Sequence, residues 1–122
     1  ELKTVKEEPR HGQSKSDLMA AEADRIRKAI PKGSLLVTLD ERGKDLTTVE
    51  FAKKLSAWQD SGESVAFVIG GTDGIDPALK QESRMMIRLS SMTLPHALAR
   101  VILSEQIYRA WSILNNHPYH RA

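Results

Sequence analysis

Two short turns carry the residue types that best suit ligand binding in this chain. The first is GGTDG at residues 70–74, and the second is LSSMTLP at residues 89–95, and each follows an apolar run. Glycine allows the backbone to approach a ligand closely. Turns at the carboxyl ends of parallel strands are also where α/β folds bind ligands. The residues therefore predict a binding site made of two loops, and they leave the ligand open.

Several common chemistries lack support in the sequence. The pattern around Gly70 is neither the Rossmann G-x-G-x-x-G nor the Walker G-x-x-x-x-G-K, so those two nucleotide-binding classes are set aside. No G-x-S-x-G is present, which removes the support for a hydrolase triad. A tight turn without a ligand remains the alternative interpretation of the glycines.

The C-terminal residues form a second candidate, HPYHRA at residues 117–122. Tyrosine and histidine rings can stack on a nucleic-acid base, and arginine can hold a phosphate. A frayed terminus is the alternative. The two histidines have no cysteine and no nearby carboxylate beside them, so we expect no metal site here.

The periodicity of apolar residues predicts alternating strands and helices. The expected strands are residues 1–5, 34–39, 64–69 and 87–91, and the expected helices are 16–30, 47–60, 76–86 and 95–114. Ser16 is expected to cap the first helix, residues 47–50 read as a capping box, and residues 40–44 are expected to form a loop. This order predicts one α/β domain over residues 1–122, with a mainly parallel sheet flanked by helices.

The last expected helix is apolar nearly all the way round, with Leu98, Val101, Leu103 and Ile107 on several faces. Such a helix must be covered on most sides. A partner subunit is the simplest cover, and Leu103 and Ile107 are the expected contact residues. Trp58 and Trp111 are both expected in the core.

Composition indicates which binding partners and which cellular compartment to expect for the protein. The chain has 122 residues, 40% of them hydrophobic, and 18 Lys and Arg against 16 Asp and Glu leave a net charge of +2. That small excess does not by itself demand nucleic acid. Cysteine is absent, which excludes disulfides and favours the cytoplasm. No apolar run approaches the roughly 20 residues that span a membrane, so no membrane association is expected.

Four segments together resemble one known family. They are VTLD at 37–40, IGGTDG at 69–74, LSSMTLPH at 89–96 and YRAWSILNNHPYHR at 108–121. The whole chain is similar to the bacterial RlmH family, also called YbeA-like, which are SPOUT-class methyltransferases. The resemblance implies a C-terminal trefoil knot, a cytoplasmic homodimer, and S-adenosyl-L-methionine as cofactor. It also leads us to expect a further N-terminal strand and helix that this sequence lacks.

The substrate implied by the resemblance is N3 of a pseudouridine in 23S ribosomal RNA of the large subunit, within an assembled ribosome. The alternatives are a non-catalytic module that binds RNA or the ribosome, and a SPOUT methyltransferase that acts on transfer RNA. The motif positions imply the following cofactor contacts: Leu39, Gly70, Gly71, Leu89, Ser90, Ser91, Met92, Thr93 and Leu94. The implied catalytic residues are Arg109, Tyr119, His120 as the general base, and Arg121.

Overall fold

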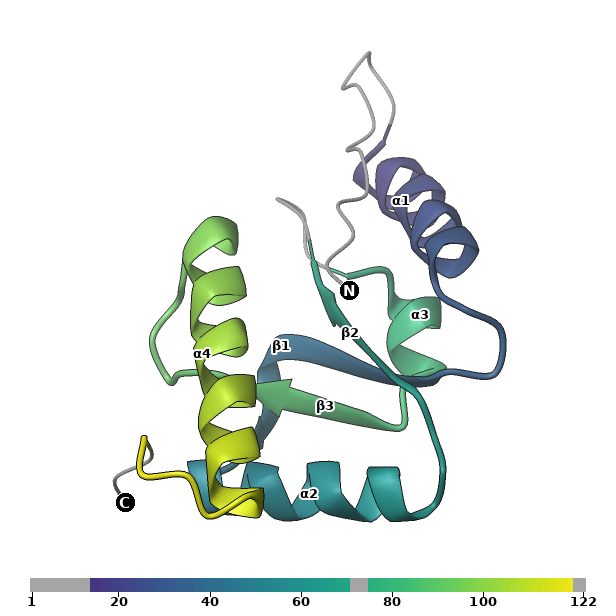
Figure 1. The fold of residues 1–122 in the computed structure, drawn as a ribbon. Helices are drawn as coiled ribbons and strands as arrows, with labels where there is room; N and C mark the ends of the chain where they lie inside the picture. The colour runs from purple at the N-terminus through teal and green to yellow at the C-terminus, as the bar shows by residue number, and fades with distance from the viewer. Residues whose placement is uncertain (1–13, 71–74, 120–122) are drawn as a thin grey trace.

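The computed structural model describes residues 14–70 and 75–119, and it is an α/β fold, as predicted (Figure 1). The elements in chain order are α1 (Lys15–Ala29), β1 (Leu35–Asp45), α2 (Thr48–Asp60), β2 (Val65–Ile69), α3 (Pro77–Gln81), β3 (Met85–Arg88) and α4 (His96–Leu114). The strand expected at residues 1–5 and the glycines at 71–74 lie outside the described residues. The trefoil knot stays a prediction.

The three strands form one parallel sheet in the order β2-β1-β3. The central strand, β1, is buried from Leu35 to Leu39, which confirms the prediction from its unbroken apolar run. The edge strand β2 is only partly covered, since Val68 alone among its residues is buried. It is less buried than β1 because, in the described sheet, β2 has only one neighbouring strand.

Helices cover both faces of the sheet (Figure 1), and each face has its own apolar cluster. The cluster under α2 and α4 consists of Leu35, Val37, Leu39, Phe51, Ala52, Trp58, Ile87, Leu103 and Ala110. The cluster under α1 and α3 consists of Ala23, Ile26, Leu36, Val68, Ile75 and Leu79. Alternate residues of β1 thus face opposite layers, as a pleated strand requires.

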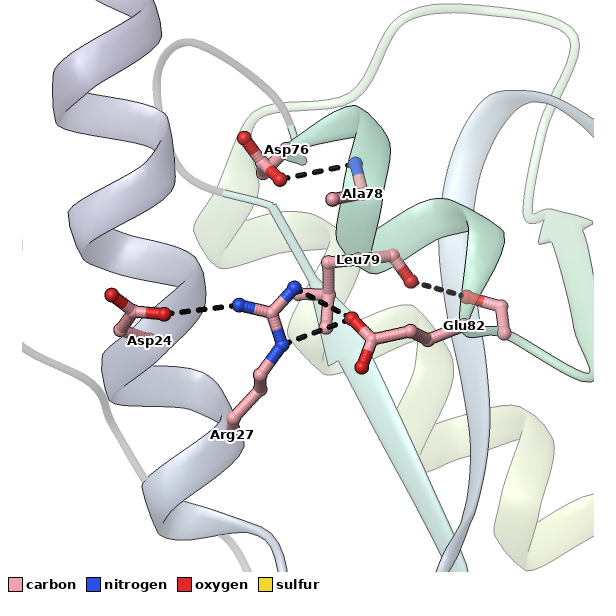
Figure 2. Close-up of polar contacts among 7 residues, drawn as sticks. Asp24, Arg27, Asp76, Ala78, Leu79 and Glu82 are labelled. Atoms are coloured by element: carbon pink, nitrogen blue, oxygen red, sulfur yellow. Dashed lines mark hydrogen bonds and ion pairs between the residues drawn. The ribbon is translucent and has the colours of Figure 1, made fainter.

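An ionic brace joins α1 to the end of α3 (Figure 2). Arg27 donates from Nε to Glu82 over 2.9 Å and from Nη1 to Asp24 over 3.0 Å. Asp76 caps the start of α3 by accepting the N–H of Ala78 at 3.0 Å. The charged groups of the brace are partly exposed, so each pair contributes at most about 1 kcal/mol to stability. The brace and the cap fix the helix that follows the glycine turn.

The structure corrects the expected loop at residues 40–44, because β1 continues to Asp45. A bulge lies between Leu39 and Lys44, and both of these residues pair with Ile87. The Arg42 N–H bonds Asp40 Oδ1 at 2.8 Å, and Arg88 Nε bonds Asp45 Oδ1 at 2.8 Å. Cross-strand contacts therefore hold polar residues in a strand that local propensity would not favour.

The boundaries around β3 also differ from the prediction. Helix α3 ends at Gln81 rather than near residue 86, and β3 spans Met85–Arg88 rather than 87–91. Residues 85–87 form an apolar run too short to separate helix from strand by periodicity. The Arg84 N–H donates to the Leu36 carbonyl at 2.8 Å, and Met85 is then in register with Val37. Pairing with β1 therefore makes residues 85–87 part of a strand rather than of the preceding helix.

Helix caps were predicted with mixed success. The capping box of Thr47 and Glu50 is confirmed, with both of its reciprocal hydrogen bonds formed. Ser16 was the wrong cap for α1, since Ser14 accepts the Asp17 N–H at 3.1 Å and Ser16 lies inside the helix. Both serines at this start are residue types that cap helices, and the earlier one extends the helix by two residues.

Helix α4 packs on α2 and the sheet through a narrow stripe of small and apolar residues, and exposes the rest. Leu103 is only 8% exposed and belongs to the core, so its expected place in a subunit contact is wrong. Trp58 is confirmed in the core, but the same prediction for Trp111 is wrong, since it is 47% exposed. The exposed apolar residues of α4 are Leu98, Val101, Ile107, Tyr108, Trp111 and Leu114.

Gly43 is required by the close approach of β1 to β3. A Cβ added there would lie 2.6 Å from the Ile87 carbonyl carbon and 2.7 Å from its nitrogen. We expect Gly43→Ala to lower the free energy of unfolding by about 1–3 kcal/mol, because backbone must move to relieve the overlap. Glu41→Ala, an exposed neighbour, should change it by less than about 0.5 kcal/mol. Equal urea midpoints for the two variants would contradict this role of Gly43.

Candidate functional site

The carboxyl ends of the three parallel strands meet at one edge of the sheet. Leu39 is in register with Ile69 of β2 and with Ile87 of β3, so it lies between the two other strand ends. Gly70 follows β2 directly, and Leu89 follows β3 directly. Three parts of the predicted cofactor site are thus brought to one place, which we call the strand-end site: Leu39, Gly70 and the loop 89–94.

The loop 89–94 combines apolar side chains with peptide groups that are free to bind a ligand. Leu89 and Leu94 are half-buried, whereas Met92 is 75% exposed. Ser90 Oγ accepts the Met92 N–H at 3.0 Å. Within the described part of the chain, residues 90–94 make no hydrogen bond from one backbone group to another. The loop can therefore offer both donors and acceptors to a polar edge.

A histidine that the sequence analysis did not single out connects the two loops. Nδ1 of His96, the first residue of α4, lies 2.5 Å from the carbonyl oxygen of Gly70. The final letter of the LSSMTLPH motif was the signal that could have identified it. The contact places Gly70 beside the start of α4.

An ion pair fixes the chain just after Leu39. Lys80 Nζ lies 2.7 Å from Asp40 Oδ2, and the Asp40 side chain is only 11% exposed. Burial alone would raise the pKa of Asp40, but the hydrogen bonds from Lys80 and the Arg42 N–H, with their positive charges, lower it overall. The pair links the end of the buried part of β1 to α3, and sequence spacing gave no sign of it.

The C-terminal residues form a separate cluster on α4, centred on Glu105. The Tyr119 hydroxyl donates to Glu105 Oε2 at 2.8 Å, and Arg109 Nε donates to the other carboxylate oxygen. The bond from Tyr119 is the main cause that lowers the pKa of Glu105, and the same bond raises the pKa of Tyr119. The Arg109 guanidinium also lies 5.1 Å from the centre of the Tyr119 ring. Glu105 was missed, although its spacing of four from Arg109 was the available signal.

Aromatic rings surround this cluster. The Tyr108 ring stacks on Trp111 at 5.7 Å and meets Tyr119 edge-on at 4.5 Å, and His117 lies 5.5 Å from Trp111. Tyr108, Trp111 and Tyr119 are 43%, 47% and 41% exposed, so each of these residues leaves part of its surface open to solvent. We call this group with Glu105 and Arg109 the tail cluster.

The tail cluster and the strand-end site do not meet within one chain. His96 contacts the glycine turn at the start of α4, whereas Glu105 and Arg109 lie nine and thirteen residues further along that helix. At the helical rise, these spacings correspond to about 14 and 20 Å along the axis. Gly71, His120 and Arg121, which are also predicted site residues, lie outside the described residues.

The family model described as "Predicted SPOUT methyltransferase" matches residues 1–120. The chain belongs to the SPOUT methyltransferase family. Proteins named "Ribosomal RNA large subunit methyltransferase H" are close relatives. The one from Ralstonia pickettii (strain 12J) is 58% identical over 122 residues, which cover 99% of this chain and 78% of the relative. The one from Burkholderia ambifaria (strain MC40-6) is 57% identical over 123 residues, or 100% of this chain and 79% of the relative.

These comparisons confirm the family resemblance and identify the protein as a methyltransferase. The family implies a methyl donor of the S-adenosylmethionine type. The strand-end site of this SPOUT methyltransferase fits such a donor, because half-buried Leu89 and Leu94 offer apolar surface and residues 90–94 make no hydrogen bond between backbone groups. Among the described residues, no helix is long and apolar enough to cross a membrane.

The ion pair at Asp40 gives a stability prediction. Lys80→Met keeps an aliphatic side chain but removes the charge, and leaves the Asp40 carboxylate largely buried without its main partner. We expect the free energy of unfolding at neutral pH to fall by about 1–3 kcal/mol. Lys54→Met, which removes an exposed lysine on α2, should cost less than about 0.5 kcal/mol.

The same variant has a predicted pH dependence. Folding lowers the pKa of Asp40. The contribution of ionised Asp40 to the free energy of unfolding is therefore fully present above about pH 3.9, the ordinary pKa of Asp. It is lost as the pH falls through the lower pKa that Asp40 has in the folded protein. The gap in stability between wild type and Lys80→Met should therefore close on acidification. Urea titrations at a series of pH values measure it, and a gap that stays constant into acid would refute the assignment.

Proposed function

We propose that this SPOUT methyltransferase transfers a methyl group from S-adenosyl-L-methionine to N3 of a pseudouridine in 23S ribosomal RNA, in the cytoplasm. One observation carries the proposal: Leu39, Gly70 and the loop 90–94, which makes no hydrogen bond between backbone groups, come together at a single edge of the sheet. The names of the relatives from Ralstonia pickettii and Burkholderia ambifaria support the large-subunit RNA as substrate.

The cofactor would be held mainly by backbone and aliphatic groups. Leu39, Leu89 and Leu94 would enclose the adenine, and the peptide groups of Ser90 to Thr93 would bond its polar edge. Gly70, with Gly71 after it, would let the backbone lie against the rest of the molecule. When bound, S-adenosyl-L-methionine supplies an electrophilic methyl group. No strongly charged side chain is needed for this kind of pocket.

The tail residues would receive the nucleotide and handle the proton on N3. His120 has a pKa range suited to taking that proton near neutral pH, and it is our candidate for the general base. Tyr119 offers a stacking face, and Arg121 can pair with a phosphate or polarise a uracil carbonyl. Glu105 holds both the Tyr119 hydroxyl and Arg109, so it would keep the stacking face and a cation together.

The proposed substrate is the RNA within an assembled large subunit. The net charge of +2 allows the protein to neutralise few phosphates, so free RNA would bind weakly. The exposed rings of the tail cluster provide a stacking surface, which depends on shape more than on charge. An assembled particle can present a splayed base in the required geometry.

We further propose a homodimer formed through α4, and the trefoil knot of the family. The exposed apolar residues of α4 support the dimer, since a helix apolar on most sides needs cover. The axial distance of about 14–20 Å between the strand-end site and the tail cluster supports it too, since the tail of a second chain could complete the site. The knot is supported by membership of the family alone.

Deletion of residues 118–122 tests the function of the tail. We expect transfer of a labelled methyl group to large ribosomal subunits to be lost, because the stacking ring and the proposed base are removed together. Affinity for S-adenosylhomocysteine, measured by calorimetry, should stay within a few-fold of wild type, since the strand-end site is intact. Methyl transfer at a near wild-type rate would contradict the role of the tail, whereas lack of cofactor binding by wild type would contradict the proposed function itself.

The dimer is tested at two exposed positions on α4. Val101 and Ile107 are 63% and 36% exposed in the single chain, so charged residues there should leave the monomer fold intact. In a dimer, Val101→Glu together with Ile107→Glu would bury unpaired charges in the contact. Sedimentation should then show monomers, whereas the paired control Lys53→Glu with Lys54→Glu on α2 should remain dimeric. A Val101 and Ile107 double variant that sediments as a dimer would rule out this interface.

A further inference from the structure

The two loops of the strand-end site grow out of strands that do not touch each other. Gly70 follows β2 and the loop 89–94 follows β3, while β1 lies between these two strands in the sheet. The ladders with β1 set how far apart the strand ends lie, but no ladder joins β2 directly to β3 or extends to Gly70 and the loop 89–94. Among the described residues, the contact between His96 Nδ1 and the Gly70 carbonyl is the one hydrogen bond that joins residues 65–70 to residues 89–96.

His96 is well placed to hold that separation. It is the first residue of α4, directly after Pro95, and the Ala99 N–H bonds the Pro95 carbonyl at 2.9 Å. Ala99 and Leu103 are both 8% exposed, so the first turns of α4 are anchored by packing. A side chain on a packed helix positions its partner better than one on a loop. The Gly70 carbonyl thus bonds to a helix that packing holds in place.

The chemistry of the contact defines the state of the ring. A carbonyl oxygen only accepts hydrogen bonds, so Nδ1 of His96 must donate. The neutral ring must then carry its proton on Nδ1 rather than on Nε2, while the imidazolium carries both. A direct spectroscopic signature follows, because the two ring nitrogens differ in nitrogen chemical shift when one is protonated and the other is not.

We propose that His96 is a positioning residue, which sets the distance between Gly70 and the loop 89–94 by donating Nδ1–H to the Gly70 carbonyl. This role rests on the proposed function, in which Gly70 and the loop 89–94 both contact the cofactor. His96 itself needs no contact with the cofactor. Loss of the hydrogen bond lets the loops separate, and cofactor affinity falls although the fold persists.

Two variants at the same position test this role by calorimetric titration with S-adenosylhomocysteine. His96→Leu removes the donor, and we expect affinity to fall by about tenfold, the upper range for one neutral hydrogen bond. His96→Asn places an amide N–H on the same side-chain carbon that bears Nδ1, so affinity should stay within about twofold of wild type. Circular dichroism and thermal unfolding of each variant confirm that both are folded.

The outcomes separate the two proposals. A wild type that does not bind S-adenosylhomocysteine overturns the proposed cofactor site, and the role of His96 with it. A wild type that binds, with His96→Leu equal to it, overturns the role of His96 alone, as does His96→Asn being as weak as His96→Leu. In the wild type without ligand, a nitrogen correlation spectrum should show the His96 Nδ1 protonated; a neutral ring protonated on Nε2 would overturn the contact.

Discussion

Parallel pairing of β1 with a strand on each side is the interaction on which the rest of the structure depends. Its residues 35–39 are buried on both faces, so the two apolar clusters and all four helices are arranged around it. Because β2 and β3 run parallel to it, all three strands deliver their carboxyl ends to the same edge. The position of the candidate site follows from this one constraint, before any particular side chain is considered.

The bulge in β1 shows how that edge is shaped. The pairing of β1 with β3 is interrupted by a bulge after Leu39 and resumes at Lys44, which requires the absence of a side chain at Gly43. Asp40 is half-buried at the start of the bulge, and Lys80 compensates its charge. Leu39 is therefore left at the end of the continuous pairing, between Gly70 and Leu89.

Local signals allowed much of this fold to be predicted from sequence. The capping box at Thr47 and the unbroken apolar run of β1 each depend on near neighbours, and both were predicted correctly. The apolar run at residues 85–87 was divided wrongly, because its pairing with Val37 is a contact across the sheet. The polar part of β1 was assigned to a loop for the same reason.

The residues of the candidate site also fall into two groups, those that local sequence signals identified and those that depend on contacts between distant parts of the chain. Motifs identified Leu39, Gly70 and the loop 89–94, and the strand ends do bring them together. His96, Lys80 and Glu105 were missed because each acts through a side chain whose partner is fixed by packing. Trp111 was assigned to the core from its residue type, whereas its stacking on Tyr108 leaves its outer face accessible.

Mapping of amide chemical shifts during titration with S-adenosylhomocysteine tests the location of the cofactor most directly. The account predicts that the largest shifts fall at Leu39, Gly70 and residues 89–96, where three strand ends meet. Residues in the last turns of α2, a helix that covers one face of the sheet, should stay unchanged (Figure 1). Shifts concentrated on α2 or α1, with those at Gly70 and the loop 89–94 unaffected, would contradict the account.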